Sequence, residues 1–149
     1  MSQAVGRIDL ETSIGYLLKE ASSALRLAME AVLRPLGMTI TQYSCLELLA
    51  QRPGLSNSEL ARGTFVTRQS MSVLLRALEQ DGLVTRPAEP SVGKVLPARL
   101  TPRGRHVLEA ASAAVRSVEL RMLSGMTDAE QAVALKSLRS IVRSLQDDA

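Results

Sequence analysis

The sequence predicts a mainly α-helical protein with one small β-hairpin. Apolar residues recur at helical spacing over six segments of the 149-residue chain, each bounded by capping residues, prolines or glycines. Between residues 83 and 100 the apolar period changes to the alternation that is typical of strands. Aromatic residues make up only 2% of the chain, so aliphatic side chains must build the core, as helix-on-helix packing allows. Two short helices followed directly by a hairpin predict a winged helix-turn-helix. The longer helices at both ends of the chain are expected to serve dimerisation.

The first long helix is expected over residues 11–34, after a loose arm of ten residues. Pro35 and Gly37 end this helix. Thr41 is expected to cap a second, shorter helix, which an Arg-Pro-Gly turn closes.

Residues 56–81 predict two helices joined by a tight turn. Ser56 and Glu59 have the S-x-x-E spacing of a capping box at the start of the first helix. Gly63 is expected to end that helix, because glycine readily takes the left-handed conformation of a helix exit. Thr67 is expected to cap the second helix. The apolar face of this second helix consists of Met71, Leu74, Leu75 and Leu78.

The opposite face of the second helix carries guanidinium, amide, hydroxyl and methyl groups. These groups read base edges and bind phosphates in the DNA major groove. The residues that we expect to read bases are Arg68, Gln69, Ser72 and Arg76, with Ser70 and Val73 on the same helix. The alternative for any one of them is a contact with phosphate alone.

Further phosphate contacts are predicted around this motif. Ser56, Asn57 and Thr67 lie at helix N-termini, where backbone N–H groups and the helix dipole favour an anion. Arg62 and Arg86 are candidate phosphate clamps. For the three residues at helix N-termini the alternative is plain helix capping. For the two arginines the alternative is an ordinary surface charge.

The hairpin is expected to pair residues 83–86 with residues 95–100 across a loop punctuated by proline and glycine. Pro97 suits an edge strand, and both strands of a two-stranded ribbon are edges. A hairpin behind a recognition helix is a wing, and its tip would bring Lys94 to the minor groove or to phosphates.

The C-terminal part predicts two more helices. Thr101 and Pro102 have the cap and first-turn positions of a helix, and Thr127 with Glu130 has a second capping-box spacing. We expect one domain over residues 1–149, with helices 11–34 and 102–147 forming a dimer interface and residues 41–100 forming the DNA-binding lobe. These long helices carry more apolar surface than a compact winged helix covers, which favours a homodimer. A monomer with an intrachain four-helix core is the alternative.

Charge and residue usage narrow the function classes. The whole chain has a net charge of +3, whereas residues 62–105 contain eight Lys or Arg against three Asp or Glu, an electrostatic footprint for phosphate. Cys45 and His106 are the only cysteine and histidine, so neither a disulfide nor a Cys/His metal site is expected, and no cofactor is predicted. No catalytic constellation appears, so the chain is not expected to be an enzyme. No apolar segment of membrane-spanning or signal-peptide length occurs, and a cytoplasmic location is expected.

Four phrases resemble the MarR family of transcriptional regulators, in order and over nearly the whole chain. They are Thr41-Gln42-Tyr43, Leu60-Ala61, the segment from Leu78 to Val84, and Leu100-Thr101-Pro102-Arg103-Gly104. The resemblance implies a homodimer with two winged helices on a pseudo-palindromic operator, released by a small ligand or by thiol oxidation. One departure is the wing tip, where the family usually carries Asp-x-Arg and this chain has Ser91-Val92-Gly93-Lys94. Lysine lacks the planar fork of arginine, so Lys94 is expected to contact phosphate rather than bases.

Three residues are candidates for an effector site. Tyr16 and Tyr43 carry hydroxyl groups suited to a phenolic or carboxylate ligand, with core packing as the alternative. Cys45 lies where the resemblance implies a ligand cleft, and is either a small core residue or a thiol sensor.

The sequence thus predicts a DNA-binding transcriptional repressor that a small molecule releases from its operator. The rival prediction is a winged-helix module that binds protein and not DNA, and a thiol-based sensor that uses Cys45 is a further alternative.

Overall fold

The computed structural model describes residues 6–86 and 98–146. Its elements in chain order are α1 (Ile14–Leu33), a 3-10 turn η1 (Arg34–Leu36), α2 (Ile40–Gln51), α3 (Asn57–Thr64), α4 (Arg68–Gln80), β1 (Val84–Thr85), β2 (Arg99–Leu100), α5 (Pro102–Met122) and α6 (Asp128–Gln146). The predicted mainly helical fold with one hairpin is confirmed.

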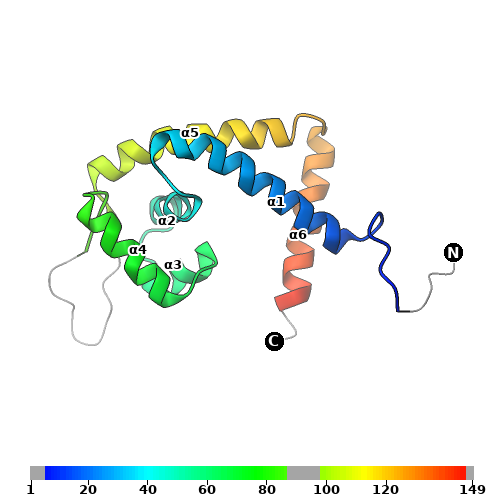
Figure 1. The fold of residues 1–149 in the computed structure, drawn as a ribbon, viewed down its shortest axis with the longest axis horizontal. Coiled ribbons are helices and arrows are strands. Elements are labelled where there is room, and N and C mark those ends of the chain that lie inside the picture. Colours follow the sequence, from blue (N-terminus) through cyan, green and yellow to red (C-terminus); the bar gives the residue numbers. More distant parts are fainter. Residues whose placement is uncertain (1–5, 87–97, 147–149) are drawn as a thin grey trace.

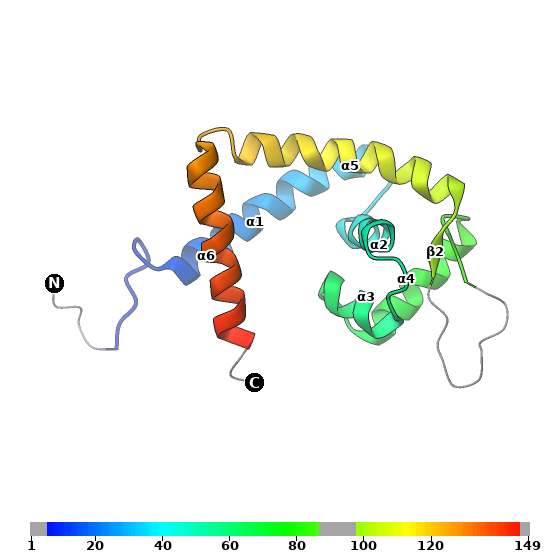
Figure 2. The same cartoon turned by 180° about the vertical axis from the view of Figure 1, so that it is seen from behind.

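Two parts are visible along the length of the molecule (Figure 1). Helices α1 and α5 pack against each other, and α2 lies beneath them and links them to a lobe made of α3, α4 and the hairpin. At the other end, α6 turns away from the end of α5, as the reverse view also shows (Figure 2). The core lies where α2, α3 and α4 meet the hairpin and the first half of α5.

The first two helices begin at caps that differ from the prediction. Helix α1 starts three residues later than expected, because the Ser13 hydroxyl accepts the backbone N–H of Tyr16. Helix α2 is capped by Thr39 and not by Thr41, so that prediction is wrong. The Thr39 hydroxyl accepts from the backbone N–H of Gln42, and the Gln42 side chain accepts from the backbone N–H of Thr39, which completes a capping box.

The end of α3 also differs from the prediction. Ser56 caps this helix as expected, but Gly63 lies inside it and Phe65 is the C-cap, with a left-handed φ of 62°. A Cβ at Gly63 would lie 2.7 Å from Leu48 Cδ1, so glycine here allows α3 to pack closely against α2. Thr67 caps α4 as predicted.

The hairpin and α5 are joined by a compact junction. Strands β1 and β2 pair antiparallel, with Val84 opposite Leu100. The hydroxyl of Thr101 donates to the Gly82 carbonyl at 2.6 Å and accepts from the backbone N–H of Gly104 at 3.0 Å. This threonine therefore caps α5 and ties it to the exit of α4. Residues 87–97, which include the predicted tip residue Lys94, lie outside the described residues.

Helix α6 buries none of its side chains in the single chain. Its exposed apolar residues are Val133, Leu135, Leu138, Val142 and Leu145. The capping box at its start is formed as predicted, since Thr127 and Glu130 exchange two hydrogen bonds. An amphipathic helix with an uncovered apolar stripe requires a second surface to bury it.

Candidate nucleic-acid interface

Helix α4 presents one buried and one exposed face. Its inward side chains are Met71, Leu75 and Leu78, with Leu74 half-buried beside them. Its exposed side chains include Arg68, Gln69, Ser70, Val73 and Arg76. The apolar stripe fixes α4 in the lobe. Of the predicted base-reading residues, Arg68, Gln69 and Arg76 are exposed on the outer face, whereas Ser72 is half-buried.

The predicted phosphate contacts at the helix starts act as caps in this structure. The Ser56 hydroxyl accepts from the backbone N–H of Glu59 at 3.1 Å, and the Glu59 carboxylate accepts from the backbone N–H of Ser56 at 3.0 Å. The backbone and hydroxyl bonds of Ser56 lower the pKa of Glu59. The Thr67 hydroxyl accepts from the backbone N–H of Ser70 and donates to the Ser70 hydroxyl, both at 3.0 Å. Capping orders each helix start, and a phosphate contact there stays a prediction.

Two predicted DNA contacts are bonded to each other. Asn57, at the start of α3, donates through Nδ2 to the Ser72 hydroxyl oxygen on α4 at 2.8 Å. Both residues are half-buried. The bond links the two helices of the motif across 15 positions of sequence.

The two predicted arginine clamps differ in their surroundings. Arg62 is exposed on α3. Arg86 is half-buried and pairs with Glu79 at 3.5 Å, so a phosphate at Arg86 would compete with that carboxylate.

The three candidate effector residues lie in three different environments. Tyr16 is exposed on α1, and the half-buried Tyr43 donates to Glu47 at 2.7 Å. Cys45 is fully buried, with its Sγ 3.9 Å from the Sδ of Met71. Burial raises the pKa of Cys45 to about 11, and both properties disfavour the thiolate that oxidation requires.

A cleft of about 870 Å³ lies between α1, the start of α2 and the turn after α3. Its lining includes two guanidinium groups, Arg26 and Arg34, together with Met38 and Thr39. Phe65, which is 93% exposed, borders the same cleft. None of these residues was predicted as a ligand contact, because three separate elements contribute to the cleft.

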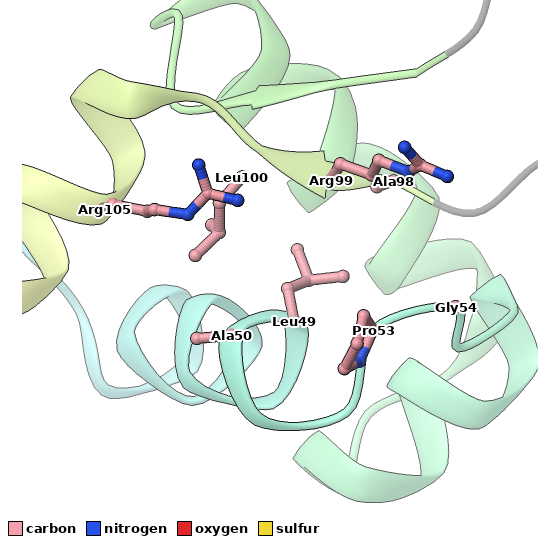
Figure 3. A pocket seen from close by; sticks show the side chains of 8 residues that line it. All are labelled: Leu49, Ala50, Pro53, Gly54, Ala98, Arg99, Leu100 and Arg105. Carbon is pink, nitrogen blue, oxygen red and sulfur yellow. The ribbon is translucent and has the colours of Figure 1, made fainter.

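A smaller cavity of about 510 Å³ lies between the end of α2, the turn that follows it, β2 and the start of α5 (Figure 3). Leu49, Pro53 and Leu100 give it apolar walls, and the Arg105 side chain extends beside Leu100. Arg99 points away from Leu49 in this view. The cavity contains none of the candidate effector residues.

Comparison with known proteins decides the family. A model of the MarR family matches residues 36–94. The HTH-type transcriptional repressor Rv2887 of Mycobacterium tuberculosis is 46% identical over 121 residues, which span 81% of this chain and 87% of the relative. The chain belongs to the MarR family.

Solved structures of MarR proteins agree with this fold. The structure of Rv2887 in complex with DNA matches 87% of this chain and 98% of its own, with 41% identity and a TM-score of 0.72. Its complex with salicylic acid matches 87% of this chain and 96% of its own, with 43% identity and a TM-score of 0.71. The transcriptional repressor CouR bound to a 23-mer DNA duplex matches 96% and 100% of the two chains, with 28% identity and a TM-score of 0.80.

Two further observations on this MarR-family chain concern metal sites and membrane-spanning helices. No group of three or more His, Cys, Asp or Glu side chains in residues 6–86 and 98–146 is placed to hold a metal ion. Within the same residues no helix is both long enough and apolar enough to cross a bilayer.

A polar network that was not predicted joins α2 to α5. The Glu47 carboxylate accepts from Tyr43 and from Ser112 at 2.7 Å each, and from Gln51 at 2.9 Å. Burial raises the pKa of Glu47, but the hydrogen bonds from Gln51, Ser112 and Tyr43 outweigh it, and the net pKa is lowered. Burial, followed by the bond to Glu47 and its charge, raises the pKa of Tyr43. The network thus holds α2 against the long helix α5.

Replacing Glu47 with glutamine is expected to destabilise the protein by about 1–3 kcal/mol at pH 7, because the new amide group faces existing donors. Since the folded-state pKa of Glu47 is depressed, its stabilisation is present above the unfolded pKa of about 4.3 and is lost as the pH falls through the folded value. Urea unfolding at pH 7 and pH 3 should therefore show a wild-type advantage that shrinks in acid. The control Glu109→Gln, on the exposed side of α5, should show neither effect.

Proposed function

We propose that this MarR-family chain is a homodimeric transcriptional repressor that binds a pseudo-palindromic DNA operator and is released by a small aromatic carboxylate. The observation that carries the proposal is the exposed polar face of α4, held outward by its buried stripe and by the Thr67 cap. Each α4 would enter a major groove, and the two half-sites would lie about 34–36 Å apart, one turn of DNA.

The dimer is supported by α6, because its apolar stripe is uncovered in the single chain. The predicted division into dimerisation helices and a DNA-binding lobe is part of the proposal. The chain is proposed to have no catalytic activity and to act in the cytoplasm.

The test of DNA binding is a gel shift on the DNA upstream of the protein's own gene, at two salt concentrations and with nonspecific competitor. A discrete complex that survives competitor and weakens steeply with salt is expected. Absence of binding even at low salt would instead favour the protein-interaction module.

The cleft between α1, α2 and Phe65 is the proposed effector site. Salicylic acid, which is bound in a solved complex of Rv2887, has the aromatic body and carboxylate that an apolar wall and the guanidinium groups of Arg26 and Arg34 suit. Arg26 pairs with Glu30 at 3.4 Å at an exposed position, and such a pair gives way readily to another acceptor. Ligand in this cleft would shift the population between two separations of the DNA-binding lobes.

The double variant Arg26→Ala/Arg34→Ala is expected to need at least about tenfold more salicylic acid for release from DNA, because both charged donors are gone. Its DNA affinity without ligand should equal that of wild type. The charge-matched control is Arg116→Ala/Arg121→Ala on α5, which should keep wild-type release. Equal salicylic acid sensitivity in all three proteins would place the effector elsewhere.

A further inference from the structure

One lone pair of the Ser72 hydroxyl oxygen is already engaged in a hydrogen bond within the chain. Its oxygen accepts from Nδ2 of Asn57 at 2.8 Å. A serine hydroxyl has one hydrogen to donate and two lone pairs to accept with, so it ordinarily reads either donors or acceptors on a base. Occupation of one lone pair by Asn57 shifts Ser72 toward donating.

The hydrogen of the Ser72 hydroxyl is not used inside the described part of the chain. Other helical hydroxyls donate to a carbonyl one turn back, as Thr64 does to Leu60 at 2.7 Å and Ser117 does to Ala114 at 2.6 Å. Within residues 6–86 and 98–146 no corresponding bond from Ser72 is formed. Among the described residues its donor therefore has no acceptor, and it is available to a base.

The orientation of the Asn57 amide follows from its burial. Oδ1 of Asn57 is buried and has no partner among the described residues. Exchanging the oxygen and nitrogen would place an NH₂ group with two donors in that buried position, and unpaired buried donors are rarer in folded proteins than under-satisfied acceptor oxygens. The amide nitrogen therefore faces Ser72, and the polarity of the bond is set by the interior of the lobe.

The neighbours of Ser72 on α4 are also donors. Arg68 lies four positions before Ser72 and Arg76 four positions after it, so the three side chains form one strip on the helix. Guanidinium groups donate and never accept. A strip with three donating side chains matches base edges that accept, which in the major groove are purine N7, guanine O6 and thymine O4.

We propose that Asn57 is a positioning residue that commits the Ser72 hydroxyl to donate, so that Ser72 reads a purine N7 in each half-site. This inference rests on the proposed function, because it requires α4 to lie in a major groove. It assigns Asn57 to base selection through Ser72 rather than to a phosphate contact of its own.

The test uses a duplex selected from a random pool by the full-length wild-type protein. Each purine of that duplex is then replaced singly, and symmetrically in both half-sites, by its 7-deaza analogue, which lacks the N7 acceptor. For wild type, one symmetric position should lose affinity by about five- to tenfold per half-site through the Ser72 contact. Ser72→Ala should bind the unmodified duplex more weakly and show no further loss at that position, while keeping the losses that arginines cause elsewhere.

The variant Asn57→Asp tests whether Asn57 positions the Ser72 hydroxyl. A carboxylate only accepts, so the Ser72 hydroxyl would donate to it and be lost to the base. The variant should therefore match Ser72→Ala in its insensitivity at that one position. Ser58→Asp, on the same turn of α3, adds the same charge at a residue that has no hydrogen bond to Ser72 within the described residues, and it should weaken binding generally while keeping the wild-type deaza profile. Asn57→Ala is a second, uncharged variant for the case that the Asn57→Asp protein does not fold. It should reduce the loss of affinity that 7-deaza substitution causes at the purine that Ser72 contacts.

The outcomes separate the inference from the proposed function. A selected duplex with identical deaza profiles for wild type, Ser72→Ala and Asn57→Asp would overturn the inference and leave the regulator intact. A profile changed by Ser72→Ala but by neither Asn57 variant would also overturn it, since Asn57 would then have no positioning role. Failure of wild type to select any sequence would overturn the proposed function and the inference with it.

Discussion

Replacing Gly104 with alanine is expected to destabilise the protein by about 3 kcal/mol or more, because the added methyl group has no space. A Cβ at Gly104 would overlap the carbonyl oxygen of Leu83 and lie 3.0 Å from the Leu83 carbonyl carbon. The obstacle is backbone, and the Leu83 carbonyl is held in place by a bond from the Thr101 N–H at 3.0 Å. Rotating a side chain cannot relieve this overlap. Thermal and urea unfolding measure the loss.

Gly15→Ala is the matched control for this substitution. Gly15 is also helical, but the nearest atom to its added Cβ is Ser13 Oγ at 3.9 Å. Alanine is there expected to be neutral or to stabilise by up to about 1 kcal/mol, since it is the better helix former. Unfolding curves of the Gly104 variant that coincide with those of the Gly15 variant would contradict the packing of α5 on the α4 exit.

Replacing Arg76 with alanine is expected to cause a large loss of operator affinity. Arg76 is exposed on the outer face of α4, and one bidentate contact with guanine contributes about 1–3 kcal/mol of discrimination. A dimer contains two copies, so the loss should lie between about 30-fold and about 20,000-fold. Titration of the selected operator and of a scrambled duplex measures both affinity and preference.

Two outcomes of the Arg76 titration have different meanings. Equal weakening on both duplexes, with a shallower salt dependence, would identify Arg76 as a phosphate contact. Unchanged affinity on both would contradict the placement of α4 as the recognition helix. Arg7→Ala, which removes the same charge from the exposed segment before α1, should leave both titrations at wild-type values.

Local rules succeeded where the deciding contacts span three or four residues. The capping boxes at Ser56 and Thr127 and the cap at Thr67 were all predicted, because a hydroxyl and an N–H three positions on meet in any helix start. The same rule failed at α2, where Thr39 was the better cap because Gln42 could return its bond. The resemblance to the MarR family, which rests on four short sequence phrases, was confirmed.

The wrong prediction at Gly63 shows the limit of such rules. A glycine near a helix end satisfies the sequence pattern of a stop, but this glycine lies inside α3, where an added Cβ would lie 2.7 Å from the Leu48 side chain. Phe65 takes the left-handed position instead, at a residue type that sequence rules would avoid there. The choice between the two residues depends on helix packing, which the local pattern does not contain.

The sequence by itself determined the order of the helices and the outward polar face of α4, because capping and periodicity act within one element. Only the tertiary structure decided which polar groups meet. The bond from Asn57 to Ser72 joins residues 15 positions apart, and the bond from Ser112 to Glu47 joins residues 65 positions apart. The cleft beside Arg26 likewise exists only where three elements converge. Such contacts depend on where the chain returns in space, and no spacing along the sequence encodes that.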